Sequence, residues 1–250
     1  MFDLQSNKAI LVTGASSGIG QAVSVHLSKL GFKIMLLARR EFKLKEIYST
    51  LGGDGHQYIS FDLTQLEKIE EVLKFTVEKM GPLSGMVHCA GIAPMRPLNL
   101  LKPQHLHEVM VTNFYSYIEL VRCFTKKGNF KSPASIVAIS SISSLKGSKS
   151  KIAYSSSKAA MDAATRCMAK ELAPKKIRIN TILPAWVQTS LVKEYRENWE
   201  DSDYYKKSLE EQFLGNIWPN DIAKIVAFLL SDDSSIMTGI SFPADGGRLV

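Results

Sequence analysis

Three side chains are spaced so that they could move a proton to or from a carbonyl oxygen. Tyr154 and Lys158 stand four residues apart, and Ser141 lies thirteen residues before the tyrosine. Residues four apart share one face of a helix, so the Lys158 ammonium can lie beside the Tyr154 phenol. A neighbouring cation lowers the pKa of a phenol, which general acid–base catalysis near neutral pH requires. The Ser141 hydroxyl could hydrogen-bond the same substrate oxygen.

A glycine-rich turn near the start of the chain supports this interpretation. Residues 13–20 read Thr-Gly-Ala-Ser-Ser-Gly-Ile-Gly and follow an apolar run. Glycines permit a tight turn and a close backbone approach, and the N-terminus of the next helix offers amide donors to a pyrophosphate. The spacing, Gly-x-x-x-Gly-x-Gly, differs from the Gly-x-Gly-x-x-Gly fingerprint of dinucleotide-binding turns. We predict a nucleotide-binding turn made of Gly14, Ser16, Ser17, Gly18, Ile19 and Gly20.

Alternating apolar and amphipathic segments surround these residues. Short β-rich runs at 9–12, 33–37, 58–61, 85–88, 135–139, 177–182 and 240–242 alternate with helical spacing at 21–30, 65–79, 104–124, 155–173 and 221–230. Continuous apolar strands between amphipathic helices are typical of a parallel sheet covered on both faces. The sequence therefore predicts one α/β domain over residues 1–250, a doubly wound Rossmann-type fold with about seven strands.

One charged and aromatic stretch, 186–218, interrupts that alternation. It is longer than ordinary connections in such folds. We expect it to fold over the strand ends as a substrate lid, and the alternative is an extra packing or oligomer-contact element.

Composition restricts the class of protein. The chain is 45% hydrophobic and 22% charged, and its net charge of +7 comes from scattered lysines without a recognition motif, so no nucleic-acid partner is predicted. No apolar run is long enough to span a membrane, and no leader pattern is present, so a cytoplasmic location is expected. Cys89, Cys123 and Cys167 lack metal spacing; no metal is predicted, and all three are interpreted as small buried apolar residues.

Two arginines indicate which nucleotide is bound. Ala38-Arg39-Arg40 follows the second apolar run, where NAD-binding sheets place an acid for the ribose 2′-hydroxyl. Guanidinium groups can instead pair with a 2′-phosphate, so NADP(H) is predicted, with the arginines merely solvating the turn as the alternative. Asp62 and Leu63 follow the third run and are candidates for the adenine side, although Asp62 could equally be a helix cap.

The glycine turn, Ser141, Tyr154 and Lys158, in this order, resemble the short-chain dehydrogenase/reductase family. The resemblance extends from about Lys8 to Gly247. It also includes His88-Cys89-Ala90-Gly91, Asn113, Pro184 and Asp245-Gly246-Gly247.

The resemblance implies a role for each matching residue. Tyr154 would protonate the carbonyl oxygen as hydride arrives from nicotinamide, Lys158 would lower the phenol pKa and hold the nicotinamide ribose, and Ser141 would polarise the carbonyl. Asn113 would be the fourth catalytic member, supporting a water chain to the lysine. The further cofactor contacts that it implies are Ala90, Gly91, Pro184, Val187 and Thr189.

Two positions depart from the family pattern. His88 and Cys89 stand where asparagines are common, so His88 is interpreted as structural. The usual Pro-Gly reads Pro184-Ala185, and alanine would be strained there if the backbone takes a positive φ.

The leading functional hypothesis is an NADPH-dependent reductase of a ketone or a 3-oxoacyl substrate, with a general likeness to 3-oxoacyl-(acyl-carrier-protein) reductases. The alternatives are an alcohol or sugar dehydrogenase running oxidatively with NAD, and a cofactor-binding protein without turnover. Many members of the family are tetramers, so the resemblance implies a homo-tetramer or dimer built through the helices that carry Asn113 and Tyr154.

Two lysine clusters suggest how a carrier protein could be attracted. Lys126, Lys127 and Lys131 precede the strand before Ser141, while Lys175 and Lys176 follow the helix of Tyr154. Both clusters could lie at the active-site rim, where they would steer an acidic acyl carrier protein; the alternative, which the sequence favours, is that they are solvated loop lysines.

Overall fold

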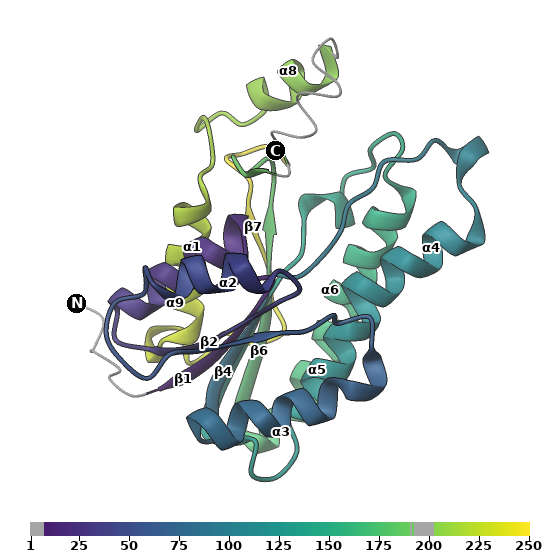
Figure 1. Cartoon of the computed structure of the whole chain (residues 1–250). Helices are drawn as coiled ribbons and strands as arrows, with labels where there is room; N and C mark the ends of the chain where they lie inside the picture. The colour runs from purple at the N-terminus through teal and green to yellow at the C-terminus, as the bar shows by residue number, and fades with distance from the viewer. Residues whose placement is uncertain (1–7, 191, 193–202) are drawn as a thin grey trace.

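A sheet of seven parallel strands runs through the molecule in the computed structural model, which describes residues 8–190, 192 and 203–250 (Figure 1). The strands lie in the order β3-β2-β1-β4-β5-β6-β7. This order confirms the predicted Rossmann-type fold, because two βαβ halves diverge from a switch point between β1 and β4. The strand bounds are β1 Ala9–Thr13, β2 Lys33–Ala38, β3 Gln57–Ser60, β4 Leu83–His88, β5 Phe130–Ile139, β6 Ile177–Pro184 and β7 Ser241–Ala244.

Helices cover both faces of the sheet (Figure 1). On one face are α1 (Gly18–Lys29), α2 (Glu41–Tyr48) and α9 (Pro219–Leu230); on the other are α3 (Ile69–Met80), α5 (Ser116–Phe124) and α6 (Ile152–Leu172), with α4 (Pro103–Met110) leading into α5. The short helix α8 (Asp203–Glu210) stands beyond the end of the sheet near the C-terminus. Within the described ranges, no helix has the length and apolar character needed to cross a membrane.

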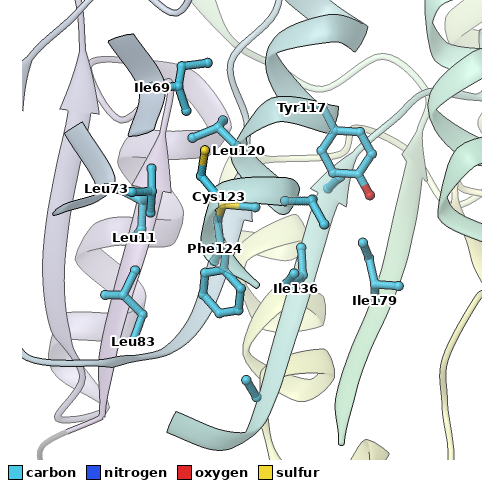
Figure 2. Close-up of a cluster of buried hydrophobic side chains, with 14 of the residues drawn as sticks. Leu11, Ile69, Leu73, Leu83, Tyr117, Leu120, Cys123, Phe124, Ile136 and Ile179 are labelled. Carbon is cyan, nitrogen blue, oxygen red and sulfur yellow. The ribbon is translucent and has the colours of Figure 1, made fainter. Parts of the chain in front are cut away.

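The sheet has a hydrophobic core on each face, and each strand contributes side chains to both because successive side chains point to opposite faces. In β1, Leu11 belongs to the cluster beneath α3, α5 and α6, whereas Ile10 and Val12 belong to the cluster beneath α1 and α9. Figure 2 shows part of the first cluster, with Leu73 from α3 and Phe124 from α5 among the side chains gathered over the strands. Burying each such side chain contributes roughly 1.5–3 kcal/mol. The continuous apolar runs of the sequence are thus explained by burial on both faces.

The helix predicted at 104–124 contains a break in its regular hydrogen bonding. Between α4 and α5 lies a π-helical turn, Val111–Tyr115, in which the Ser116 N–H donates to the Val111 carbonyl. Asn113 is in the middle of this turn and is fully buried. Such turns are frequent at functional sites because they redirect one side chain without ending the helix.

The prediction for the cysteines is right for Cys123, which is buried, and wrong for Cys167, which is exposed; Cys89 is half-buried. The reason is helical phase. The buried face of α6 includes Thr165 and Ala169, and Cys167 lies two residues from each, which is ~200° round the helix.

The prediction that the lysine clusters flank the active site is also wrong. The clusters do meet, because the Lys175 carbonyl accepts from Ser132 Oγ at 3.2 Å and Lys175 Nζ donates to the Thr125 carbonyl at 3.3 Å. They meet, however, at the amino ends of β5 and β6, whereas Ser141 follows the carboxyl end of β5. The ten residues of β5 separate these ends by roughly 30 Å.

Candidate active site

The carboxyl ends of β1, β2 and β4 border a cavity of ≈450 Å³. This is the edge at which open parallel sheets bind their ligands. Cys89, Ile92 and Thr112, which were not predicted as cofactor contacts, also line it. The predicted cofactor residues that the structure brings together here are Gly14, Ser16, Ser17, Gly18, Ile19, Gly20, Arg39, Arg40, Asp62, Leu63, Ala90, Gly91 and Thr189.

The glycine turn has the close packing that a phosphate-binding turn requires. Gly14 has φ +64°, and a Cβ there would lie 2.7 Å from the backbone nitrogen of Ala90, so a side chain is excluded both by conformation and by contact. Helix α1 begins at Gly18, and the first N–H groups of a helix have no intrahelical acceptors. A Cβ on Gly18 would meet the Thr189 side chain at 3.3 Å. The turn therefore fits a dinucleotide phosphate, with amide donors and no side chain in the way.

Arg40 lies across the glycine turn. One of its guanidinium nitrogens donates to Ser16 Oγ at 3.0 Å and to Ser17 Oγ at 2.9 Å. Arg39 is exposed at the same cavity, so two guanidinium groups line it. Asp62 lines the cavity, and its Oδ1 accepts hydrogen bonds from the backbone and side chain of Thr64. It does not cap a helix, because the N-cap of the next helical turn is Gln65.

A second cavity of ≈130 Å³ adjoins the first, and Ile19 and Thr189 line both. Two candidate reacting groups, Ser141 and Tyr154, line this second cavity. Pro184 and Val187, predicted to contact the cofactor, line this cavity rather than the larger one.

Ser141 and Tyr154 are positioned by the start of two helical segments. Ser141 is the N-cap of a short 3₁₀ turn, Ile142–Ser144, and its Oγ accepts from the Ser143 N–H at 3.1 Å. Tyr154 is in the first turn of α6. Burial raises the pKa of Tyr154, and its hydrogen bond with Ser141 lowers that pKa by less. The net shift is opposite to the lowering expected from Lys158, so the phenol is protonated at neutral pH.

Lys158 lies behind the two cavities. Its side chain is only 4% exposed, and Nζ donates to the Ile139 carbonyl at 2.7 Å. Nζ is 5.8 Å from the centre of the Tyr154 ring. Burial lowers the pKa of Lys158 to about 8, so the ammonium is still mainly charged at pH 7. The predicted i,i+4 neighbourhood is present, but the direct partner of the ammonium is the backbone before Ser141.

Asn113 joins the loop after β4 to α6. Its Oδ1 accepts from the Ile92 N–H at 2.8 Å, while Nδ2 donates to the Ile92 carbonyl at 2.9 Å and to Ser157 Oγ at 3.0 Å. A Cβ on Gly91 would lie 3.2 Å from Asn113 Oδ1 and 3.7 Å from Lys158 Nζ. Asn113 therefore holds the loop that separates the lysine from the cofactor cavity.

The two departures from the family pattern have local explanations. His88 is fully buried, is hydrogen-bonded through Nδ1 to Thr13 Oγ1 at 3.0 Å and packs against the Tyr117 ring. Burial, reinforced by the charge of Lys158, lowers the pKa of His88 to about 3, so this neutral side chain fits the structural interpretation. The expected strain at Ala185 is absent, because positive φ among the described non-glycine residues is confined to Ser150 and Lys176.

The beginning and the end of the predicted lid, residues 186–218, are hydrogen-bonded to each other. The Trp186 N–H donates to Gln212 Oε1 at 2.7 Å, and the Gln188 N–H donates to the Ile217 carbonyl at 2.9 Å. Residues 191 and 193–202 of this stretch lie outside the described residues.

Three cations that line the second cavity were not anticipated as functional: Lys146, Lys151 and Arg248. For Lys151 a signal was available, because it stands three residues before Tyr154 and such a pair shares a helix face. Arg248 has no comparable local signal, since it is 97 residues from Lys151 along the chain.

Comparisons with known proteins agree with this architecture. A family model described as enoyl-(acyl carrier protein) reductase matches residues 14–248. An L-xylulose reductase from Caenorhabditis elegans is 33% identical over 246 residues, covering 97% of this chain and 96% of the relative. A 3-oxoacyl-[acyl-carrier-protein] reductase from Vibrio cholerae is 30% identical over 240 residues, covering 96% of each chain.

A solved structure of actinorhodin polyketide ketoreductase with NADPH superposes with a TM-score of 0.88 at 26% identity, covering 99% of each chain. The match of the family model to nearly the whole chain, the full-length relatives and the shared fold lead to one conclusion: the chain belongs to the short-chain dehydrogenase/reductase family of NAD(P)(H)-dependent oxidoreductases.

Proposed function

We propose that this protein reduces a ketone or 3-oxoacyl carbonyl with NADPH. The observation that carries the proposal is the arrangement of Ser141 and Tyr154 on a small cavity that shares Ile19 and Thr189 with the larger nucleotide-sized cavity. A carbonyl held in the small cavity would lie next to a cofactor held in the large one.

The chain's own residues would each perform one task. The nicotinamide, when bound, supplies hydride. The Ser141 hydroxyl and the Tyr154 phenol would hydrogen-bond the carbonyl oxygen, and Tyr154 would donate its proton to the developing alkoxide. Lys158 would stabilise the phenolate that remains, and Asn113 would act as a positioning residue through its bonds to Ile92 and Ser157.

The protonation state of Tyr154 supports reduction over oxidation. A general acid must carry its proton when the reaction begins, and burial raises the pKa of this phenol. Oxidation of an alcohol would instead need the phenolate as base. The oxidative alternative, an alcohol or sugar dehydrogenase, therefore predicts activity only at more alkaline pH than reduction.

The function is tested by screening carbonyl compounds with NADPH and NADH. The panel contains small ketones, ketoses, 3-oxoacyl thioesters and 3-oxoacyl groups on an acyl carrier protein, and the loss of absorbance at 340 nm is followed. Turnover of at least one compound supports the proposal. NADPH binding measured by calorimetry without turnover of any compound would instead favour a binding protein without catalysis.

The carrier-bound substrate remains an alternative within the proposal, because a relative that is 30% identical is named a 3-oxoacyl-[acyl-carrier-protein] reductase. The lysine clusters no longer support it, since they lie at the opposite edge of the sheet. We also propose a homo-dimer or tetramer through the α4–α6 side, where Tyr115 and Ile152 expose apolar surface. Sedimentation velocity measures this state directly.

The preference for NADPH rests on Arg39 and Arg40. Replacing both with glutamine is expected to lower the ratio of kcat/KM for NADPH to that for NADH roughly 10–100-fold, because charge-assisted hydrogen bonds to a 2′-phosphate are lost. Adding Ala38→Asp should lower the ratio further through repulsion. The measurement is steady-state kinetics with each nucleotide.

Lys43→Gln is the matched control, because Lys43 is a nearby cation on α2 whose ammonium is paired with Glu46. It should keep the wild-type ratio. If the unaltered protein uses NADH as well as NADPH, the argument from the arginines is wrong.

A further inference from the structure

The small cavity has a cationic wall. Lys146, Lys151 and Arg248 line it, whereas no aspartate or glutamate is among the described residues that do so. Lys151 and Arg248 are each only 8% exposed.

Arg248 is held rigidly in that wall. Its Nε donates to Glu211 Oε2 at 3.1 Å and one terminal nitrogen donates to Ser208 Oγ at 2.7 Å. The same Glu211 oxygen accepts from Lys146 Nζ at 3.0 Å. The Glu211 carboxylate is therefore paired with both Lys146 and Arg248, and Lys151 is the third cation of the wall.

Lys151 and Arg248 both lie near the ring of Trp186. Its Nζ is 4.2 Å from the centre of the Trp186 ring, and the Arg248 guanidinium carbon is 6.0 Å from the same centre. Burial and then repulsion by Arg248 lower the pKa of Lys151 to about 8. An anion held in this cavity would be attracted by both positive charges, and the attraction is stronger at a buried site than in water.

We propose that the substrate carries an anionic group, a carboxylate or a phosphate, which Lys151 and Arg248 bind beside Trp186 while Ser141 and Tyr154 hold its carbonyl. This inference rests on the proposed function and narrows its substrate class to small oxo acids or oxo phosphates. A cavity of ≈130 Å³ has room for a compound of roughly ten non-hydrogen atoms.

The test compares each anion with a neutral partner that has the same carbonyl. The pairs are 3-oxobutanoate and 4-oxopentanoate with their ethyl esters, and dihydroxyacetone phosphate with dihydroxyacetone. The quantity measured is the ratio of kcat/KM for the anion to kcat/KM for its neutral partner, with NADPH. We expect this ratio to be ten or more for at least one pair. A high ratio for an oxo acid indicates that the site binds a carboxylate, and a high ratio for dihydroxyacetone phosphate indicates a phosphate.

Variants assign that preference to Lys151. Lys151→Gln should lower the ratio roughly 10–100-fold, because a charge-assisted hydrogen bond is lost, and Lys151→Arg should restore most of it. Lys149→Gln is the matched control: it removes an exposed charge from the same loop that does not line the cavity, and should keep the wild-type ratio.

The pH dependence of the ratio is a second signature. Both members of a pair use Tyr154 and Lys158, so the titration of these groups cancels in the ratio. The other ionisable groups at the cavity are Lys146 and Arg248, with Glu211 behind them. Because Lys151 loses its proton near pH 8, the preference for the anion should fall as the pH rises through 8. In Lys151→Arg it should persist to about pH 9.5, because arginine stays charged.

Two results would overturn the inference while leaving the proposed function standing. One is equal or better turnover of the neutral partner in every pair, and the other is a ratio that Lys151→Gln leaves within about twofold of wild type. If no compound is turned over, the proposed function fails. Calorimetry with 4-oxopentanoate and with inorganic phosphate then still decides the inference, which requires weaker binding of one of them to Lys151→Gln than to wild type and Lys149→Gln.

Discussion

Replacing Tyr154 with phenylalanine is expected to remove nearly all turnover while leaving NADPH binding close to wild type. General acid catalysis contributes typically 10²–10⁴-fold, and the hydroxyl is the only group of Tyr154 that the change removes. The residues that line the nucleotide cavity are untouched, because Tyr154 lines the small cavity instead. The measurements are kcat with the best carbonyl substrate and the Kd for NADPH from fluorescence titration.

Ser143→Ala is the matched control for Tyr154→Phe, because it removes a hydroxyl from the same cavity wall while its N–H still donates to Ser141 Oγ. Its kcat should stay within a few-fold of wild type. If Tyr154→Phe retains more than a tenth of the wild-type kcat, another group is the acid.

Replacing Lys158 with methionine is expected to damage both chemistry and cofactor binding. Methionine has a similar length, so the space in the core stays filled, but the ammonium that is charged at pH 7 is lost. The Ile139 carbonyl also loses its donor at 2.7 Å, which loosens the backbone that leads to Ser141. We expect kcat to fall at least 10²-fold and the Kd for NADPH to rise roughly tenfold or more.

Lys170→Met, an exposed position on the same helix, is the control for Lys158→Met and should behave as wild type. A Lys158 variant with normal NADPH affinity would contradict a cofactor role for the ammonium. Near-normal kcat would contradict its role in proton transfer.

The strands, the glycine turn and the order of the candidate residues could be predicted because each has a local cause. A strand covered on both faces must be apolar throughout, as residues 9–12 are. Position 14 must be glycine, because a Cβ there would lie 2.7 Å from the backbone nitrogen of Ala90. Ser141 and Tyr154 could be placed on one site because a strand end and a helix start converge there.

The remaining features depend on contacts that the sequence does not encode locally. The spacing of Tyr154 and Lys158 predicts that they share a helix face. It does not predict that the Lys158 ammonium donates a hydrogen bond to the Ile139 carbonyl. Lys151 and Arg248 line the same cavity although they are far apart in the sequence, and their proximity depends on the whole fold. The lysine clusters were misplaced for a simpler reason: a strand of ten residues carries its two ends to opposite sides of the molecule.

The π-helical turn at Val111–Tyr115 has a consequence for how this gene can change. An α-helix turns ~100° per residue, so the extra residue of a π turn sets α4 and α5 in different rotational phases. Losing one codon from this turn would restore ordinary helical bonding yet swing one helix by ~100°, pulling either Val109 or Tyr117 from the interior. Point substitutions in the turn leave that phase intact. Selection should therefore act more strongly against insertions and deletions in this turn than against substitutions. The length of the segment should be more conserved than its sequence.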